Sequence, residues 1–220
     1  MKKITIVTGH YGSGKTNLSV NLAVKAAEEG KKVAVVDLDL VNPYFRTADF
    51  KQLFEDMGIK LIAPDFANTN LDVPSIQFDV EQLAASEDCL IIDVGGDDAG
   101  ATALGRYAEA LLEMLPGDID MFYVINQRRT LTSNAEEAVT LMYEIEQASR
   151  MKHTAIVNNT NLGCETTAEI IEESADFADR VAEKTGLPLA FTTCPEEQCS
   201  LTGRDDILPI KVYVKLPWDR

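Results

Sequence analysis

The chain has 220 residues, of which 45% are hydrophobic and 25% charged, a balance typical of a soluble globular protein of one α/β domain. Its net charge of −16 disfavours non-specific binding to nucleic-acid backbones or anionic membranes, because both are polyanions. No segment reaches the roughly 20 apolar residues of a membrane span, so we expect a cytoplasmic protein without a membrane partner.

Short β-branched runs alternate with longer amphipathic stretches along the chain. Strands are expected at residues 3–8, 32–37, 60–63, 89–94, 120–126, 154–158 and 189–192, and helices at 15–29, 101–115, 133–149 and 166–185. Several strands are near-continuous apolar runs, which favours a parallel sheet covered on both faces. We therefore expect one α/β domain over residues 1–220, a doubly wound, mostly parallel sheet flanked by helices, with a further edge strand within 210–216.

The first strand runs into a complete phosphate-loop motif. The segment Gly9-His10-Tyr11-Gly12-Ser13-Gly14-Lys15-Thr16 matches G-x-x-x-x-G-K-[ST], and Asn17 follows it in the helix. Glycines let backbone N–H groups turn around phosphate oxygens, and the helix N-terminus adds its dipole. We expect Gly9, Gly12, Ser13, Gly14 and Asn17 to line a nucleotide site, Lys15 to reach the β- and γ-phosphates and Thr16 to ligate Mg²⁺. The alternative is a glycine-rich turn with an incidental lysine.

Two further strands end in aspartates that such a site needs. Asp37 and Asp39 close the second strand, and Asp93 closes a later one. Ligands in doubly wound folds bind beyond the carboxyl ends of the strands, so all three are placed for the site. Asp93 and Asp37 are candidate Mg²⁺ ligands, and Asp39 is a candidate for orienting the attacking water. In a chain this acidic, solvated loop carboxylates are the alternative.

The phosphate loop, the segment Asp37-Leu38-Asp39 with Asn42-Pro43 after it, and the segment Asp93-Val94-Gly95-Gly96 together resemble the MinD/ParA-type ATPases. That group includes the nitrogenase iron protein, maturation ATPases of carbon-monoxide dehydrogenase and dethiobiotin synthetase. The resemblance spans roughly residues 1–195. It implies a P-loop ATPase that takes ATP and Mg²⁺, and a glycine pair that rearranges when the γ-phosphate leaves.

The resemblance also assigns further residues. Asp97, after the glycine pair, joins Asp39 as a candidate for positioning water, as in the iron protein. Asn158 is implied as the adenine contact. Guanine-specific relatives carry an aspartate where this chain has Asn161, and an amide cannot accept two charge-assisted hydrogen bonds, so ATP is favoured over GTP. Many members carry a second lysine where this chain has His10, so a nucleotide-dependent homodimer stays open.

Three arginines follow predicted strands on the ligand side of the sheet. Arg128 and Arg129 come after the strand that ends near Asn126, and Arg46 follows the second strand. Each is a candidate contact to phosphate or to a partner, and a solvated loop arginine is the alternative.

The leading hypothesis is a slow ATPase switch that acts on an unidentified protein or metallocofactor partner. Two alternatives remain: an ATP-dependent small-molecule ligase or kinase resembling dethiobiotin synthetase, and a nucleotide sensor that does not hydrolyse ATP. The net charge and the lack of a basic run make nucleic acid a disfavoured partner.

Overall fold

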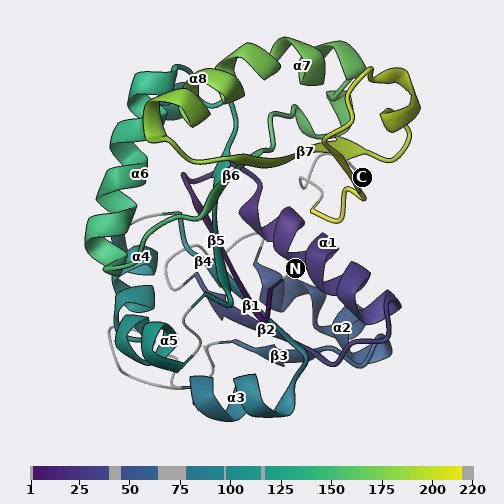
Figure 1. Ribbon diagram of the computed structural model, residues 1–220. Coiled ribbons are helices and arrows are strands. Elements are labelled where there is room, and N and C mark those ends of the chain that lie inside the picture. Colours follow the sequence, from purple (N-terminus) through teal and green to yellow (C-terminus); the bar gives the residue numbers. More distant parts are fainter. Residues whose placement is uncertain (1, 40–45, 64–77, 97, 115–116, 215–220) are drawn as a thin grey trace, which may run out of the picture.

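The computed structural model describes residues 2–39, 46–63, 78–96, 98–114 and 117–214. Within these residues it confirms the predicted α/β architecture. One parallel sheet of eight strands has the order β3-β2-β4-β1-β5-β6-β7-β8, with helices on both faces (Figure 1). The strand that leads into the phosphate loop, β1, therefore lies in the interior of the sheet between β4 and β5.

The strands are β1 Ile4–Gly9, β2 Val33–Leu38, β3 Lys60–Ile62, β4 Cys89–Val94, β5 Ile119–Ile125, β6 Ala155–Asn158, β7 Leu189–Pro195 and β8 Ile207–Ile210. The α-helices are α1 Lys15–Glu28, α2 Lys51–Asp56, α3 Val80–Ser86, α4 Asp98–Gly105, α5 Ala108–Met114, α6 Ala135–Ser149, α7 Ala168–Glu173 and α8 Ala175–Thr185. Short 3₁₀ turns lie at η1 Thr47–Phe50, η2 Thr130–Thr132, η3 Gly163–Glu165 and η4 Cys199–Leu201.

The differences from the expected elements concern the helices and the sheet edge. The helices expected at 101–115 and 166–185 are each divided in two, and the short helices α2 and α3 were not expected. The edge strand exists but lies at Ile207–Ile210, earlier than expected. Its Pro209 is tolerated because β8 is the last strand in the sheet order.

Alternation along the strands divides the core between the two faces of the sheet. In β2, Val33 and Val35 pack with α1 and α2 residues, whereas Ala34, Val36 and Leu38 pack with residues of α3, α4 and α5. Beside this second cluster, α6 and α8 cover β5 and β6. In Figure 1, α1 and α2 accordingly lie on one side of the sheet and α4, α5 and α6 on the other. Every residue of β1, β2 and β4 is buried, which explains their near-continuous apolar sequences.

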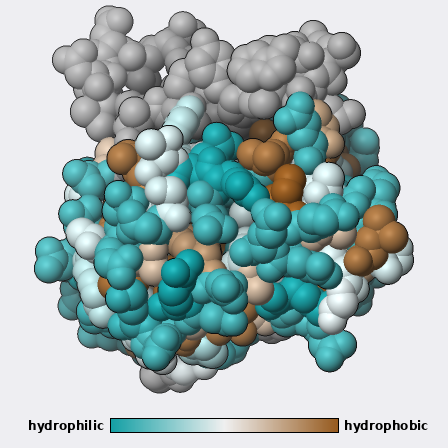
Figure 2. Space-filling model, turned by 90° about the horizontal axis from the view of Figure 1, so that it is seen from above, coloured by the Kyte–Doolittle hydropathy of each residue, from teal (hydrophilic) through white to brown (hydrophobic). Residues whose placement is uncertain are grey.

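The face seen in Figure 2 is mostly hydrophilic, with hydrophobic side chains confined to separate spots. Among the described helices, none has the length and apolar character needed to cross a membrane.

Candidate nucleotide site

The phosphate loop, residues 9–16, connects β1 to α1. Gly9, Gly12 and Gly14 have φ angles of 143°, 76° and 88°, in the region that side chains rarely adopt. At Gly9 a Cβ would also collide with the carbonyl oxygen of Val124 in β5. The Ser13 hydroxyl is buried and has no hydrogen-bond partner among the described residues. Because buried polar groups are normally paired, an unpartnered hydroxyl in this loop fits a bound phosphate.

Lys15 begins α1, and its side chain returns along the loop. Its Nζ donates to the carbonyl oxygen of His10 at 3.0 Å, and the residue is buried. Gly96, just after β4, packs on the same region: a Cβ there would lie 2.6 Å from the backbone nitrogen of Tyr11 and 2.8 Å from Lys15 Nζ. Gly96, the second glycine of the pair after Asp93, therefore lies against the phosphate loop.

Asp93 lies under the loop on β4, paired in register with Val7 of β1. Its Oδ1 accepts from the Ser19 hydroxyl at 3.0 Å, and its buried Oδ2 has no hydrogen-bond partner among the described residues. Burial, together with the nearby Asp37 charge, raises the pKa of Asp93 to about 7, while Lys15 and the Thr16 and Ser19 hydroxyls lower it. An unpartnered carboxylate oxygen near a threonine hydroxyl is a donor set suited to Mg²⁺.

The strand register places Asp37 beside Asp93. The Asp37 carboxylate binds backbone N–H groups and Arg46. Its Oδ1 accepts from the backbone N–H of Asp39 at 3.0 Å, and its Oδ2 from that of Ala48 at 3.1 Å. The Arg46 guanidinium lies 3.4 Å from both oxygens. Burial raises the pKa of Asp37, and Arg46 opposes this. These contacts fix residues 46–48 to the end of β2.

The structure brings Asp39 to the end of β2, where it is buried, but it leaves two predicted nucleotide contacts elsewhere. The Asn17 amide binds the backbone of residues 211–214, with Nδ2 donating to Lys211 O at 3.1 Å. Asn158 is fully buried: its Nδ2 donates to the Ser174 hydroxyl, and its Oδ1 accepts from Thr160. Both amides are committed to holding the fold. Asp97 lies outside the described residues.

Asn159, rather than Asn158, contacts the phosphate loop. Its Nδ2 donates to the carbonyl oxygen of Ser13 at 2.6 Å, and a Cβ on Gly14 would collide with the same nitrogen. In an extended chain, neighbouring side chains point in opposite directions, so a run of asparagines at a strand end does not reveal which one faces the loop. Gly14 is thus glycine for two reasons, its φ angle and this close approach.

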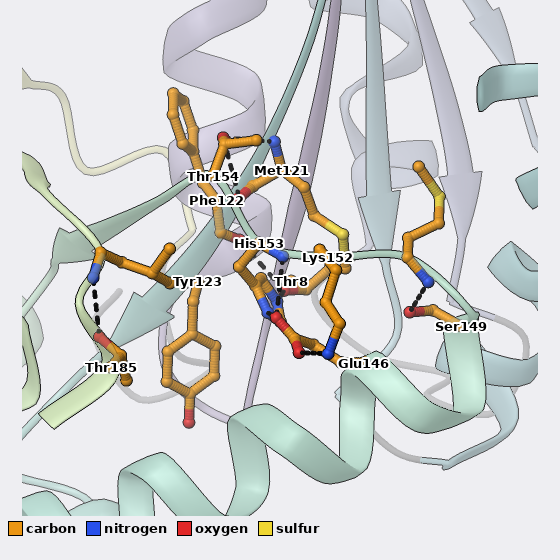
Figure 3. A network of polar contacts seen from close by, with 12 residues as sticks. Thr8, Met121, Phe122, Tyr123, Glu146, Ser149, Lys152, His153, Thr154 and Thr185 are labelled. Atoms are coloured by element: carbon orange, nitrogen blue, oxygen red, sulfur yellow. Dashed lines mark hydrogen bonds and ion pairs between the residues drawn. The ribbon is translucent and has the colours of Figure 1, made fainter. Parts of the chain in front are cut away.

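A buried polar network supports β1 just before the loop (Figure 3). Thr8 Oγ1 lies 2.7 Å from His153 Nε2, and His153 Nδ1 lies 3.2 Å from Glu146 Oε1 in α6. The Lys152 ammonium forms an ion pair with Glu146 Oε2 at 2.5 Å. Burial lowers the pKa of His153, so the ring is neutral near pH 7. Glu146 and His153 thereby connect α6 to the strand that carries the loop.

An open groove of about 360 Å³ lies beside the loop, between His10 and α6. Its lining includes Leu131 and the carboxylates of Glu136, Glu137 and Glu144. Burial and the neighbouring Lys15 lower the pKa of His10, so this residue adds no positive charge to the groove near pH 7. The groove is therefore acidic.

Comparison with known proteins identifies relatives that each match part of this chain. The chain is 34% identical over 95 residues to the signal recognition particle 54 kDa protein of Methanococcus vannielii, covering 43% of this chain and 20% of that protein. It is 34% identical over 87 residues to an iron-sulfur cluster carrier protein of Saccharolobus solfataricus, covering 34% and 29%. A match of 57% identity over 37 residues links it to an uncharacterized ATP-binding protein of Methanocaldococcus jannaschii, covering 17% and 14%. Each match spans less than a third of the relative's length.

The fold also resembles solved structures. The cell division protein FtsY of Thermotoga maritima superposes with a TM-score of 0.61 at 20% identity, over 89% of this chain and 63% of FtsY. A family model described as the CobQ/CobB/MinD/ParA nucleotide binding domain matches residues 4–161, the part that contains the loop, Asp93 and the asparagine run. The chain therefore belongs to the CobQ/CobB/MinD/ParA nucleotide-binding domain family.

Proposed function

We propose that this protein binds Mg·ATP in the phosphate loop, hydrolyses it slowly and acts as a switch on a protein or metallocofactor partner. The observation that carries the proposal is the packing of Gly96 on Tyr11 and Lys15. A segment that starts at the Asp93 metal candidate and touches the loop lysine is placed to respond when the γ-phosphate leaves.

We propose the following roles for residues within the site. The loop amides would hold the phosphates, Lys15 would pair with their oxygens, and Thr16 and Asp93 would hold Mg²⁺. Bound Mg²⁺ would neutralise charge on the β- and γ-phosphates. Asp39, and Asp97 beyond the described residues, would orient the attacking water.

Three observations bear on the choice of nucleotide. Residues 158–163 contain no carboxylate that could accept from both guanine donors, and the Asn161 amide already bonds Asn159 O and the Gly163 N–H. One relative is named as an ATP-binding protein. The signal recognition particle relative and the FtsY-like fold are reasons to test GTP as well. We therefore propose ATP as the nucleotide.

Steady-state phosphate release tests the proposal, with ATP and with GTP, in the presence of Mg²⁺ or of a chelator. We expect slow release with Mg·ATP, little with GTP, and none in Lys15→Ala. Calorimetric titration with each nucleotide accompanies it, because a sensor would bind ATP without releasing phosphate. If the wild type neither binds nor hydrolyses a nucleotide, the proposal fails.

The acidic groove beside His10 supports a second candidate, an ATP-dependent kinase or ligase that acts on a small amine. A cationic substrate would fit Glu137 and Glu144, whereas Glu136 is paired with Lys184 at 2.9 Å. This candidate predicts that one small amine stimulates ATP turnover without any protein partner, and that Glu137→Gln weakens the stimulation. A panel of small amines that leaves turnover unchanged would argue against it.

A further inference from the structure

Arg128 and Arg129, adjacent in sequence, have different surroundings. The Arg128 guanidinium pairs with Glu173 at 2.8 Å, directed toward α7. Arg129 is exposed, and within the described residues its guanidinium makes no ion pair or hydrogen bond. It lies instead over the phosphate loop: a Cβ on Gly12 would be 3.2 Å from Arg129 Nε and 3.3 Å from Cζ.

The backbone that carries Arg129 is held firmly. The buried Asn126 accepts at its carbonyl oxygen from the Arg129 N–H at 3.2 Å and from the Thr132 hydroxyl at 3.0 Å. Thr132 N donates to Arg129 O at 3.1 Å, and Gln127 N to the Thr160 hydroxyl at 3.1 Å. A fixed turn therefore presents at the loop an exposed guanidinium that has no partner in the described part of the chain, and the absence of a side chain on Gly12 leaves room for it.

An exposed arginine without a protein partner among the described residues is available to bind an anion at the loop. The chain carries a net charge of −16, so a site for a nucleotide triphosphate must supply its own positive potential. Other cations near the site have partners, since Arg46 pairs with Asp37 and Lys15 bonds the His10 carbonyl. Guanidinium groups are suited to phosphate because they offer several donors in one plane.

We propose that the Arg129 guanidinium binds a phosphate of the nucleotide held by the phosphate loop of the same chain. This inference rests on the proposed function and adds Arg129 to the cations of the nucleotide site. Arg129 is then a nucleotide ligand in cis, and Arg128 is a surface residue paired with α7.

Calorimetric titration with Mg·ATP and Mg·ADP tests this in the wild type, Arg129→Ala, Arg129→Lys, Arg128→Ala and Lys15→Ala. We expect Arg129→Ala to weaken binding of ATP, or of both nucleotides, about tenfold, the usual weight of a charge-assisted hydrogen bond. Arg129→Lys should recover part of the loss, and Arg128→Ala should bind like the wild type. Thermal unfolding without nucleotide should be the same for both alanine variants, because both side chains are exposed.

The outcomes separate this inference from the proposed function. If the wild type does not bind, or Lys15→Ala binds as well as the wild type, the nucleotide site itself is refuted. If Lys15→Ala fails to bind while Arg129→Ala matches Arg128→Ala for both nucleotides, only the role of Arg129 is overturned. Mixing Arg129→Ala with Lys15→Ala tests the cis assignment, because restored ATP affinity would mean that Arg129 acts across a dimer.

Discussion

Because Gly96 has no side chain, the backbone just after β4 can pack directly against the phosphate loop. A Cβ at this position would meet the backbone of Tyr11 at 2.6 Å, and backbone cannot move aside as a flexible side chain can. We predict that Gly96→Ala weakens ATP binding about tenfold, because overpacking of this kind costs about 1–3 kcal/mol. Calorimetric titration measures the change.

Gly203→Ala is the matched control for Gly96→Ala. A Cβ on Gly203 has its nearest neighbour at 3.9 Å, so the added methyl group should leave ATP affinity unchanged. Equal affinities in the two variants would contradict the close packing of Gly96 on the loop.

A second prediction at the scale of one residue concerns the buried Asp93 carboxylate. Burial and the nearby Asp37 charge disfavour the ionised Asp93 carboxylate, with a pKa of about 7, so Asp93→Asn should unfold at a higher urea concentration than the wild type in nucleotide-free buffer near pH 8. The same variant should lose the gain in ATP affinity that Mg²⁺ gives the wild type. Urea unfolding and calorimetry with and without Mg²⁺ measure the two effects, and an undiminished Mg²⁺ effect would remove Asp93 from the metal site.

At the scale of elements, the buried network of Thr8, His153 and Glu146 connects α6 to β1. His153→Gln should lower the free energy of unfolding by about 1–3 kcal/mol near neutral pH, the range for breaking a buried hydrogen-bond network. Lys152→Ala is the control, because the Lys152 side chain is 80% exposed and its ion pair should contribute little.

The network also predicts a pH dependence. His153 has a pKa below its unfolded value of 6.5, so the unfolded chain takes up the proton first, and this stability is lost as the pH falls below about 6.5. Burial alone would raise the pKa of Glu146, but hydrogen bonds from His153 and Lys152 lower it to about 2, so the carboxylate stays ionised throughout this window. Urea unfolding near pH 7.5 and pH 5.5 should give a smaller gap between wild type and His153→Gln at the lower pH. A gap that stays constant would argue against a neutral buried histidine.

The strands were predictable from the sequence because most are short apolar runs between polar turns. The breaks within the helices were not, because tertiary contacts set them. At Gly105, where α4 ends, a Cβ would lie 2.8 Å from the carbonyl oxygen of Ala148 in α6. At Ser174, between α7 and α8, the hydroxyl caps Ile171 O and accepts from buried Asn158. Neither contact leaves a local signal in the sequence.

In the candidate site, too, some features were predictable from the sequence and others were not. The phosphate loop and Asp93 were predictable because motif and strand end fix their positions. The directions of Asn17, Asn158 and Asp37 were not, since each amide or carboxylate takes a partner from a distant segment. The approach of Arg129 to Gly12 depends on β5 lying beside β1, which only the strand order reveals.

At the scale of the whole molecule, the position of β1 inside the sheet brings three chain segments to the loop. Asp93 comes from β4 on one side, and Arg129 comes after β5 on the other. Asn159 follows β6, one strand further along. The proposed Arg129 contact would supply positive charge from the same chain, so we expect the site to need no cation from a second chain.

The charge of the whole chain leads to the last prediction, which concerns assembly. Two chains that each carry −16 repel one another, and His10 has its pKa lowered by burial and by Lys15, so it offers no cation to a facing copy near pH 7. We expect light scattering to give the monomer mass of 24.2 kDa with and without a non-hydrolysable ATP analogue. Phosphate release per chain should then be independent of protein concentration, at low and at high salt. A doubling of mass with the analogue, or turnover per chain that rises with concentration, would mean that two copies complete the site together.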